Sequence, residues 1–223
     1  MKNRVSRLFA LALLTGLANP VQAQIIDLPP ADAVFSPAFG RPGAATFGQT
    51  FTALTGYNRL DQLTFRFFES SNGQDLSFRA YLYAWDGQKA TGNALFASDL
   101  RSGSEFSTST AFTFSTGGVS VVGGQEYVAF VNASEHFAND GPTGLMFTQI
   151  SFAGYSGGRA VWLENGSDFS AVTQTQWRGP TSGLDLAFTA SFSNAVVPEP
   201  SSAVLVIAGL AALSLSAYRR RVA

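Results

Sequence analysis

The stretch Leu184–Phe192, LDLAFTASF, places an apolar side chain at every second position. Successive side chains of a strand point to opposite faces, so this period of two predicts a β-strand with one buried face. The stretches 63–67 (LTFRF) and 77–84 (SFRAYLYA) carry the same alternation. No internal segment keeps a helical period over three turns, and the sequence therefore predicts an all-β domain.

The rest of the domain repeats this pattern in short segments. Further strand candidates are Ala45–Leu54, Leu95–Asp99, Ala111–Phe114, Val119–Val122, Tyr127–Asn132, Leu145–Ile150 and Ala160–Leu163. Turn dipeptides such as Asn72-Gly73, Gly117-Gly118 and Asn165-Gly166 separate them. About ten short strands joined by glycine-rich turns predict an antiparallel β-sandwich with a jelly-roll-like topology.

Three segments of the domain stand outside this strand pattern. Residues 24–41 are expected to form an irregular or edge segment. The long polar loops at 133–143 and 165–182 are expected to gather at the ends of the sandwich.

The C-terminal segment 197–223 has a different character. Pro198, Glu199 and Pro200 favour extended backbone, and a charge-free run of 15 residues, Ala203–Ala217, follows them. As a helix this run would be roughly 22 Å long, against about 30 Å for a hydrocarbon core. The cluster of Arg219, Arg220 and Arg221 ends the run. The order predicts a short transmembrane helix with a basic stop on the cytoplasmic side; a plain permanent anchor is the alternative.

This tail resembles the PEP-CTERM sorting domain of Gram-negative bacteria, because Pro-Glu-Pro, a short apolar helix and an arginine cluster follow one another in that order. The resemblance implies recognition of Pro198, Glu199 and Pro200 by an exosortase, a membrane-embedded processing enzyme. It also implies an association with exopolysaccharide and biofilm. The middle of the chain resembles, more weakly, the β-sandwich ectodomains found ahead of such anchors, through stretches such as 81–87 (YLYAWDG) and 165–169 (NGSDF).

The N-terminus carries a second membrane signal. Basic residues up to Arg7 precede the apolar run Leu8–Leu17, which is too short to span a bilayer, and Val21-Gln22-Ala23 fits a cleavage site. We therefore expect a signal peptide at residues 1–23, cleavage between Ala23 and Gln24, an ectodomain at 24–196 and the sorting signal at 197–223. The chain would be exported, held transiently in the inner membrane, and delivered to the cell surface or extracellular matrix.

Composition narrows the partners and the chemistry. The chain has no cysteine, which excludes disulfides, thiolate metal sites and a cysteine nucleophile. Residues 24–196 hold eight basic and 14 acidic side chains, a net charge of −6. A domain of that charge is a poor partner for nucleic acid and for acidic polysaccharide.

Catalytic patterns are sparse. The single histidine, His136, has no nucleophile elbow or further zinc ligands to accompany it. The sequence therefore predicts no catalytic residue, no metal centre and no cofactor, although paired carboxylates of a glycosidase and a structural calcium ion stay open. Glu135–Asp140 and Glu164–Asp168 are the calcium candidates. The tripeptides 132–134 and 165–167 match the Asn-x-Ser glycosylation sequon, which in a bacterial chain is taken as accidental.

Tryptophans suggest where a sugar could bind, since sugar recognition uses exposed aromatic faces beside polar groups. Trp177, in a polar loop beside Arg178, is the candidate platform, and Trp85 beside Asp86 is a second. Packing in the sheet is the alternative role for Trp85 and Trp162. The sequence thus favours a non-catalytic surface or matrix protein that binds glycan. A secreted hydrolase acting on polysaccharide and a purely structural or adhesive ectodomain are the alternatives.

Replacing Pro198 and Pro200 together with alanine should block processing of the tail, because the helix could then extend upstream through the recognition motif. The unprocessed precursor should accumulate in the membrane fraction, as seen by immunoblotting. Mass analysis of the delivered wild-type protein supplies the control: a mature chain that still ends at Ala223 would contradict processing.

Overall fold

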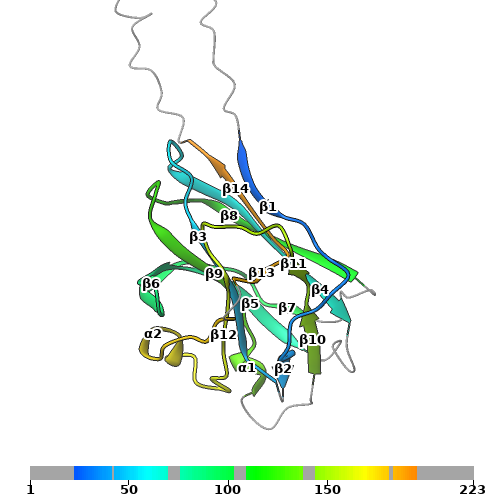
Figure 1. The fold of residues 1–223 in the computed structure, drawn as a ribbon. Coiled ribbons are helices and arrows are strands. Elements are labelled where there is room, and N and C mark those ends of the chain that lie inside the picture. The colour runs from blue at the N-terminus through cyan, green and yellow to red at the C-terminus, as the bar shows by residue number, and fades with distance from the viewer. Residues whose placement is uncertain are drawn as a thin grey trace, which may run out of the picture.

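Two six-stranded antiparallel sheets pack face to face in the computed structural model (Figure 1). The structure describes residues 23–41, 43–69, 76–102, 109–137, 144–180 and 183–194. Their fourteen strands and two short helices confirm an all-β, sandwich-like fold. The strand number exceeds the ten expected because several strands have only two or three residues.

The first sheet is built around the long strand β4 (Arg59–Glu69). Strands β14 (Phe188–Ser193) and β10 (Gly144–Thr148) share one edge of β4, and β8 (Ser109–Ser120) pairs with the other edge. The sheet continues outward to β1 (Gln24–Leu28) beyond β14 and to β2 (Phe39–Arg41) beyond β10. The edge position expected for the N-terminal segment is confirmed for β1.

The second sheet has the strand order β12-β3-β9-β5-β6. Its bounds are β12 (Ala160–Leu163), β3 (Thr46–Thr52), β9 (Glu126–Asn132), β5 (Ser77–Trp85) and β6 (Ala90–Ala97), with β7 (Arg101–Ser102) pairing to the start of β5. A two-stranded pair, β11 (Ile150–Ser151) with β13 (Asp185–Leu186), lies beside the sandwich. The helices are α1 (Ser134–Phe137) and α2 (Ala171–Gln174).

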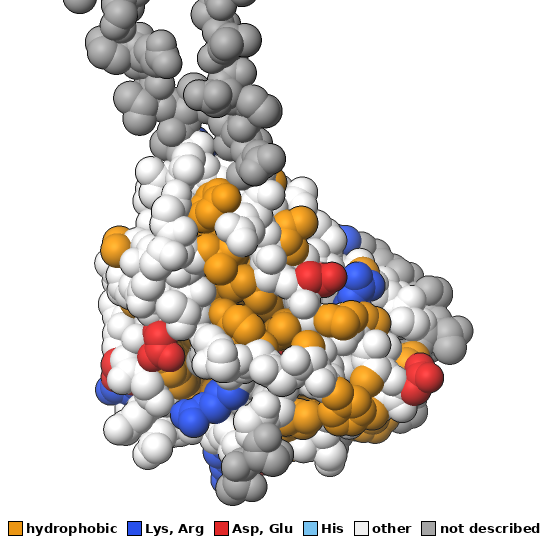
Figure 2. Space-filling view, turned by 45° about the horizontal axis from the view of Figure 1, so that its top comes forward, with side chains coloured by type: hydrophobic (Ala, Val, Ile, Leu, Met, Phe, Trp, Pro, Cys, Tyr) orange, Lys and Arg blue, Asp and Glu red, His pale blue; other side chains and the backbone are white. Residues whose placement is uncertain are grey.

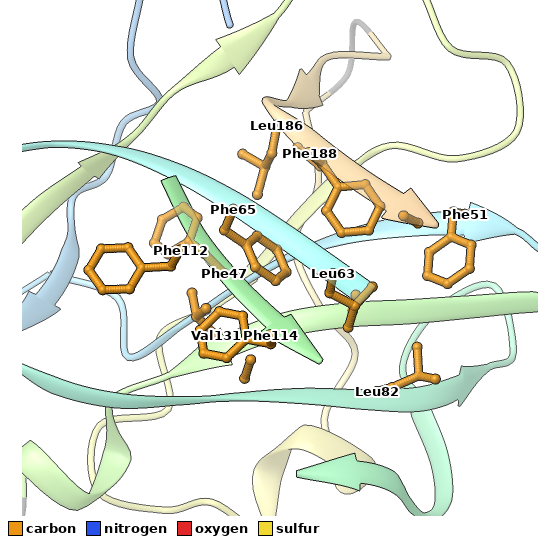
Figure 3. Close-up of a cluster of buried hydrophobic side chains, with 14 of the residues drawn as sticks. Phe47, Phe51, Leu63, Phe65, Leu82, Phe112, Phe114, Val131, Leu186 and Phe188 are labelled. Atoms are coloured by element: carbon orange, nitrogen blue, oxygen red, sulfur yellow. The ribbon is translucent and has the colours of Figure 1, made fainter. Parts of the chain in front are cut away.

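Phenylalanine fills the space between the sheets. Phe65 of β4 lies opposite Phe188 of β14 in the strand register, and their ring centroids are 5.3 Å apart. Figure 3 shows Phe47, Phe112 and other side chains from both sheets pointing into one cluster. The alternation seen in the sequence therefore marks the core face of β4, β5 and β14.

The stretch that predicted a single strand, Leu184–Phe192, forms two. Ala187 is buried and donates its N–H to the carbonyl of Gln149, which separates β13 from β14. Asp185, which alternation alone would turn outward, is 1% exposed. Its burial comes from pairing with β11, a strand outside the sandwich register.

Asp185 forms a buried polar contact with β3. Its Oδ1 accepts a hydrogen bond of 2.8 Å from Gln49 Nε2, and its Oδ2 accepts one of 3.0 Å from the Tyr155 N–H. Gln49 Oε1 in turn accepts the Leu186 N–H at 2.8 Å. Burial raises the pKa of Asp185 above its ordinary value of 3.8, while the two donors oppose the rise.

Both ends of the domain lie at the same end of the sandwich. Gln24 pairs with Phe192 across β1 and β14. Figure 1 shows this end at the top, with α1, α2 and β2 at the opposite end. Within the described ranges no helix is long and apolar enough to span a membrane. The expected signal helix and the whole sorting tail lie outside those ranges.

Replacing Gln49 with leucine should lower the free energy of unfolding by about 2–4 kcal/mol at neutral pH, since two buried groups lose their partners. The raised folded pKa means that the contribution of Asp185 to stability is present below pH 3.8 and lost as the pH rises through the folded pKa. The Gln49 amide that this substitution removes donates to the ionised form of Asp185. The destabilisation caused by Gln49→Leu should therefore become smaller as the pH falls toward about 4 and Asp185 becomes protonated.

Urea unfolding at both pH values measures this effect, with Gln62→Leu on the exposed surface of β4 as the control. A loss for Gln49→Leu that does not differ between the two pH values would show that the ionised carboxylate is not what Gln49 stabilises.

Candidate functional site

The segment 164–180 covers the outer face of the second sheet. Backbone hydrogen bonds join Trp162 and Arg178 in both directions at 2.9 Å, and the Trp177 N–H donates to the Gln88 carbonyl at 2.9 Å. These bonds hold the segment flat against β12 and the turn after β5. We call residues 164–180 the cover segment.

Trp177 anchors the cover segment in a second apolar cluster. Its ring is 6% exposed, lies 5.2 Å from Phe130 and 5.6 Å from Trp85 in edge-to-face arrangements, and donates its indole N–H to the Val172 carbonyl at 2.8 Å. The prediction of an exposed Trp177 platform is therefore wrong. The loop around it is polar, but its backbone bonds turn this one side chain onto the sheet.

The other residues of that predicted sugar site also have partners within the domain. Trp85 is 8% exposed and packs on Trp177. Asp86 is exposed and accepts the N–H groups of Lys89 and Gln88, which lower the pKa of its carboxyl. Arg178 is exposed and pairs with Glu164 at 2.9 Å. The structure brings the two tryptophans together as a buried pair with no open aromatic face.

An open pocket lies at the other end of the cover segment, beside α1. It has a volume of about 340 Å³ and is lined by Tyr81, Asn132, Ser134, Glu135, Ser167 and Phe169. Both segments expected to form loops at a sandwich end contribute to it, and the Asn165 side chain joins them by donating to Ser134 Oγ at 3.0 Å.

Two aromatic rings form one wall of this pocket. Tyr81 and Phe169 are both half-buried, with ring centroids 4.9 Å apart and planes tilted by 43°. Tyr81 also stacks on Phe130 at 5.2 Å, which fixes its position on the sheet. Burial, followed by the nearby Glu135 carboxylate, raises the pKa of Tyr81, so its hydroxyl is a neutral donor and acceptor at physiological pH.

A buried polar network forms the floor. Asn132 Nδ2 donates to Thr46 Oγ1 at 2.7 Å and to Ser134 Oγ at 3.0 Å, and Thr46 Oγ1 donates to Asn165 Oδ1 at 2.7 Å. Ser134, 3% exposed, thus accepts hydrogen bonds from both asparagines. Among the described residues its own hydroxyl hydrogen has no acceptor, so the pocket floor offers one donor to a ligand.

The charge at the pocket is balanced. Glu135 Oε1 lies 3.1 Å from Arg79 Nε, and Arg79 Nη1 donates to the Ser98 carbonyl at 3.0 Å. Glu135 is the one carboxylate among the lining residues. The described residues contain no group of three or more His, Cys, Asp or Glu side chains placed to hold a metal ion. A calcium ion at the two acidic stretches, one of which extends beyond the described residues, stays a prediction.

Comparison with known proteins adds a fold relationship. No family model matches the chain, and no curated protein matches it. The clostridial cysteine protease Cwp84 after propeptide cleavage is structurally similar, with a TM-score of 0.51 and 12% identity over 78% of this chain. The chain spans 40% of the length of that protein.

A second solved structure holds the cysteine protease and lectin-like domains of Cwp84, a surface layer associated protein of Clostridium difficile. It matches 67% of this chain and 32% of its own, with a TM-score of 0.44 and 12% identity. At 12% identity, the likeness to the first of these structures concerns the fold alone.

Two short sequence motifs point to this pocket, whereas the positions of the tryptophans do not. The two Asn-x-Ser tripeptides, 132–134 and 165–167, are 33 residues apart but supply Asn132, Ser134, Asn165 and Ser167 to one network and its rim. Tyr81 and Phe169 belong to no motif that predicts a place in this pocket.

Replacing Trp177 with alanine should lower the free energy of unfolding by about 3–5 kcal/mol, because it leaves a cavity and frees the cover segment. Chemical denaturation measures this change. Phe152→Ala is the control, since its ring is 72% exposed and its loss should cost within about 0.5 kcal/mol. If Trp177→Ala is as stable as Phe152→Ala, Trp177 is not part of the core.

Proposed function

We propose that this chain is an exported surface or extracellular-matrix protein of a Gram-negative bacterium, sorted through its PEP-CTERM tail. A signal peptide directs export, a short transmembrane helix holds the precursor in the inner membrane, and an exosortase-type enzyme recognises it through Pro198, Glu199 and Pro200 and processes the tail. Its jelly-roll-like sandwich is a non-catalytic module that binds neutral glycan, with exopolysaccharide as the natural source. The pocket lined by Tyr81, Ser134 and Phe169 is the binding site.

The position of the pocket relative to the chain ends carries this proposal. Gln24 and Phe192 pair at one end of the sandwich, whereas α1 lies at the opposite end (Figure 1). Ser134 and Glu135 of α1 line the pocket. A tail anchored in a membrane would therefore point the pocket away from the bilayer. Ala23, immediately before β1, is exposed, which fits the proposed cleavage between Ala23 and Gln24.

The composition of the pocket favours a neutral sugar. Sugar rings present apolar C–H faces that pack on aromatic rings, as Tyr81 and Phe169 offer, and hydroxyl groups that accept and donate hydrogen bonds. Ser134 offers a donor, and the Tyr81 hydroxyl offers both functions. The paired Arg79 and Glu135 leave no net charge to attract an anion, and the acidic domain as a whole disfavours one.

A binding role fits the pocket better than hydrolysis does. Glycoside hydrolysis requires two carboxyl groups facing each other across the scissile bond. The pocket lining supplies Glu135 alone, and its carboxylate is already paired with Arg79.

Replacing Phe169 with alanine should weaken retention of neutral polysaccharide by about tenfold, since an aromatic contact of this kind contributes about 1.4 kcal/mol. The measurement is affinity electrophoresis of the purified chain in gels containing neutral or acidic polysaccharides. Phe152→Ala, which removes an exposed ring outside the pocket, should leave retention unchanged.

Two results would overturn the proposed site or the proposed function. Retention that survives Phe169→Ala would place the glycan elsewhere on the domain. Absence of retention on every neutral polysaccharide, or release of sugar products by the purified chain, would remove the non-catalytic glycan-binding function itself.

A further inference from the structure

Two turns and both ends of the described domain form one end of the sandwich. Backbone hydrogen bonds join the turns, since Val121 donates its N–H to the Asn58 carbonyl at 3.0 Å and Gly124 donates to the Ala53 carbonyl at 2.8 Å. The N–H of Asn58 lies 3.4 Å from the carbonyl of Ser193, the last residue of β14. We call this end the chain-end surface; it lies at the top of Figure 1 and contains residues 24–26, 53–60, 117–125 and 191–194.

The chain-end surface is apolar and nearly free of charge, although the domain is acidic. Its four stretches contain a single charged residue, Arg59, whereas residues 24–196 carry a net charge of −6. Two of its apolar side chains are largely exposed, Ile25 at 54% and Val122 at 63%. Figure 2 turns this end of the sandwich toward the viewer and shows hydrophobic side chains there with few charged groups. Interfacial binding to a membrane depends on such apolar area and on attraction between cations and anionic lipids.

The turn of β8 positions Arg59 on this surface. Its Nη2 donates to the Gly117 carbonyl at 3.1 Å, and its guanidinium lies against Gly118, where a Cβ would clash with it. Gly118 also has a positive φ, so the backbone conformation and the close contact both favour glycine.

Arg59 keeps most of its hydrogen-bonding capacity. A guanidinium carries five N–H donors and can bind a phosphate group with two of them at once. The buried Nε of Arg59 has no hydrogen-bond partner, and no carboxylate pairs with this side chain among the described residues. A hollow of about 360 Å³ lies beside the guanidinium and is lined by Asn58, Arg59, Gly118, Ser120 and Val121.

The predicted tail keeps this surface close to a bilayer. Residues 195–202 separate Asn194 from the predicted transmembrane helix that begins at Ala203. Because an extended chain spans at most about 3.5 Å per residue, the chain-end surface lies within about 30 Å of the start of that helix. A tether of this length makes any contact with the bilayer intramolecular, so individually weak contacts suffice. This step rests on the tail anchor of the proposed function.

We propose that the chain-end surface is a membrane-docking surface of the anchored precursor. Ile25 and Val122 enter the interfacial layer of the bilayer, and the Arg59 guanidinium binds the phosphate of an anionic phospholipid. Docking directs the glycan pocket away from the bilayer and keeps the Pro-Glu-Pro motif at the membrane surface, where the processing enzyme recognises it. Without the tail, these contacts alone are too weak to retain the mature chain.

The absence of cysteine allows single fluorescent probes in the full chain. Val122→Cys, Gln174→Cys and Ser214→Cys are each labelled with the same fluorophore, and the chain is reconstituted into vesicles of phosphatidylcholine and phosphatidylglycerol. The vesicles contain a lipid with a nitroxide quencher just below the headgroup. Gln174 is exposed on α2 at the opposite end and is the matched control. Ser214 lies in the predicted helix and reports insertion of the tail.

Quenching at Val122 should be about threefold stronger than at Gln174. On the Val122→Cys chain, Arg59→Gln should lower the ratio of docked to undocked molecules about fivefold, the effect of one arginine near an anionic surface. Arg178→Gln removes an exposed arginine of the cover segment and should leave this ratio unchanged. Raising the salt concentration should also weaken the quenching at Val122, which tests the headgroup contact without a substitution.

Three results would contradict the proposal, and they separate docking from the anchor. If Ser214 is quenched but Val122 is quenched no more than Gln174, docking is wrong and the anchor stands. If Ser214 is not quenched, the tail anchor is wrong and docking fails with it. If Arg59→Gln and Arg178→Gln have equal effects, Arg59 does not bind the headgroup.

Discussion

The structure depends on the burial of β9 on both of its faces. Tyr127, Ala129 and Val131 face the core between the sheets, while Phe130 and Val128 face outward in the second cluster. Phe130 has no exposed surface, so the outer side of its sheet must be covered. Trp177 meets this requirement, and the hydrogen bonds of its segment to Trp162 and Gln88 follow from it. Covering one phenylalanine therefore determines where the cover segment lies.

The candidate pocket follows from the same constraint. The cover segment starts where β12 ends and must turn back over the sheet, and that turn brings Asn165, Ser167 and Phe169 beside Ser134. Phe130 also stacks on Tyr81. The aromatic wall of the pocket and the cover segment therefore both pack against the Phe130 side chain. The face in Figure 2 carries a band of hydrophobic side chains and few, scattered charged groups. The fold relies on apolar packing, and the two ion pairs seen among the described residues, Arg79–Glu135 and Arg178–Glu164, lie at the surface, where such pairs contribute little.

Sequence periodicity was sufficient for the strands whose two faces differ in polarity. Phe65 and Phe188 could be assigned to a core because polar residues alternate with them, and the all-β fold follows from such strands. Where both faces are buried, as around Phe130, alternation disappears and the outer cluster could not be foreseen. The pair Gly117-Gly118 was interpreted as a turn, but in the structure it is a bulge within β8, since positive φ serves both purposes. Trp177 was misplaced because loop polarity does not reveal which side chain a backbone contact turns inward.

The cover segment belongs to the cooperative core of the domain. Native-state hydrogen exchange tests it most directly, by following the Trp177 amide, bonded to Gln88, and the Trp177 indole N–H, bonded to Val172. Our account predicts that both exchange as slowly as the amides of β9, with the free energy of global unfolding. Exchange of the two Trp177 protons at the rate of a surface loop, while β9 stays protected, would contradict it.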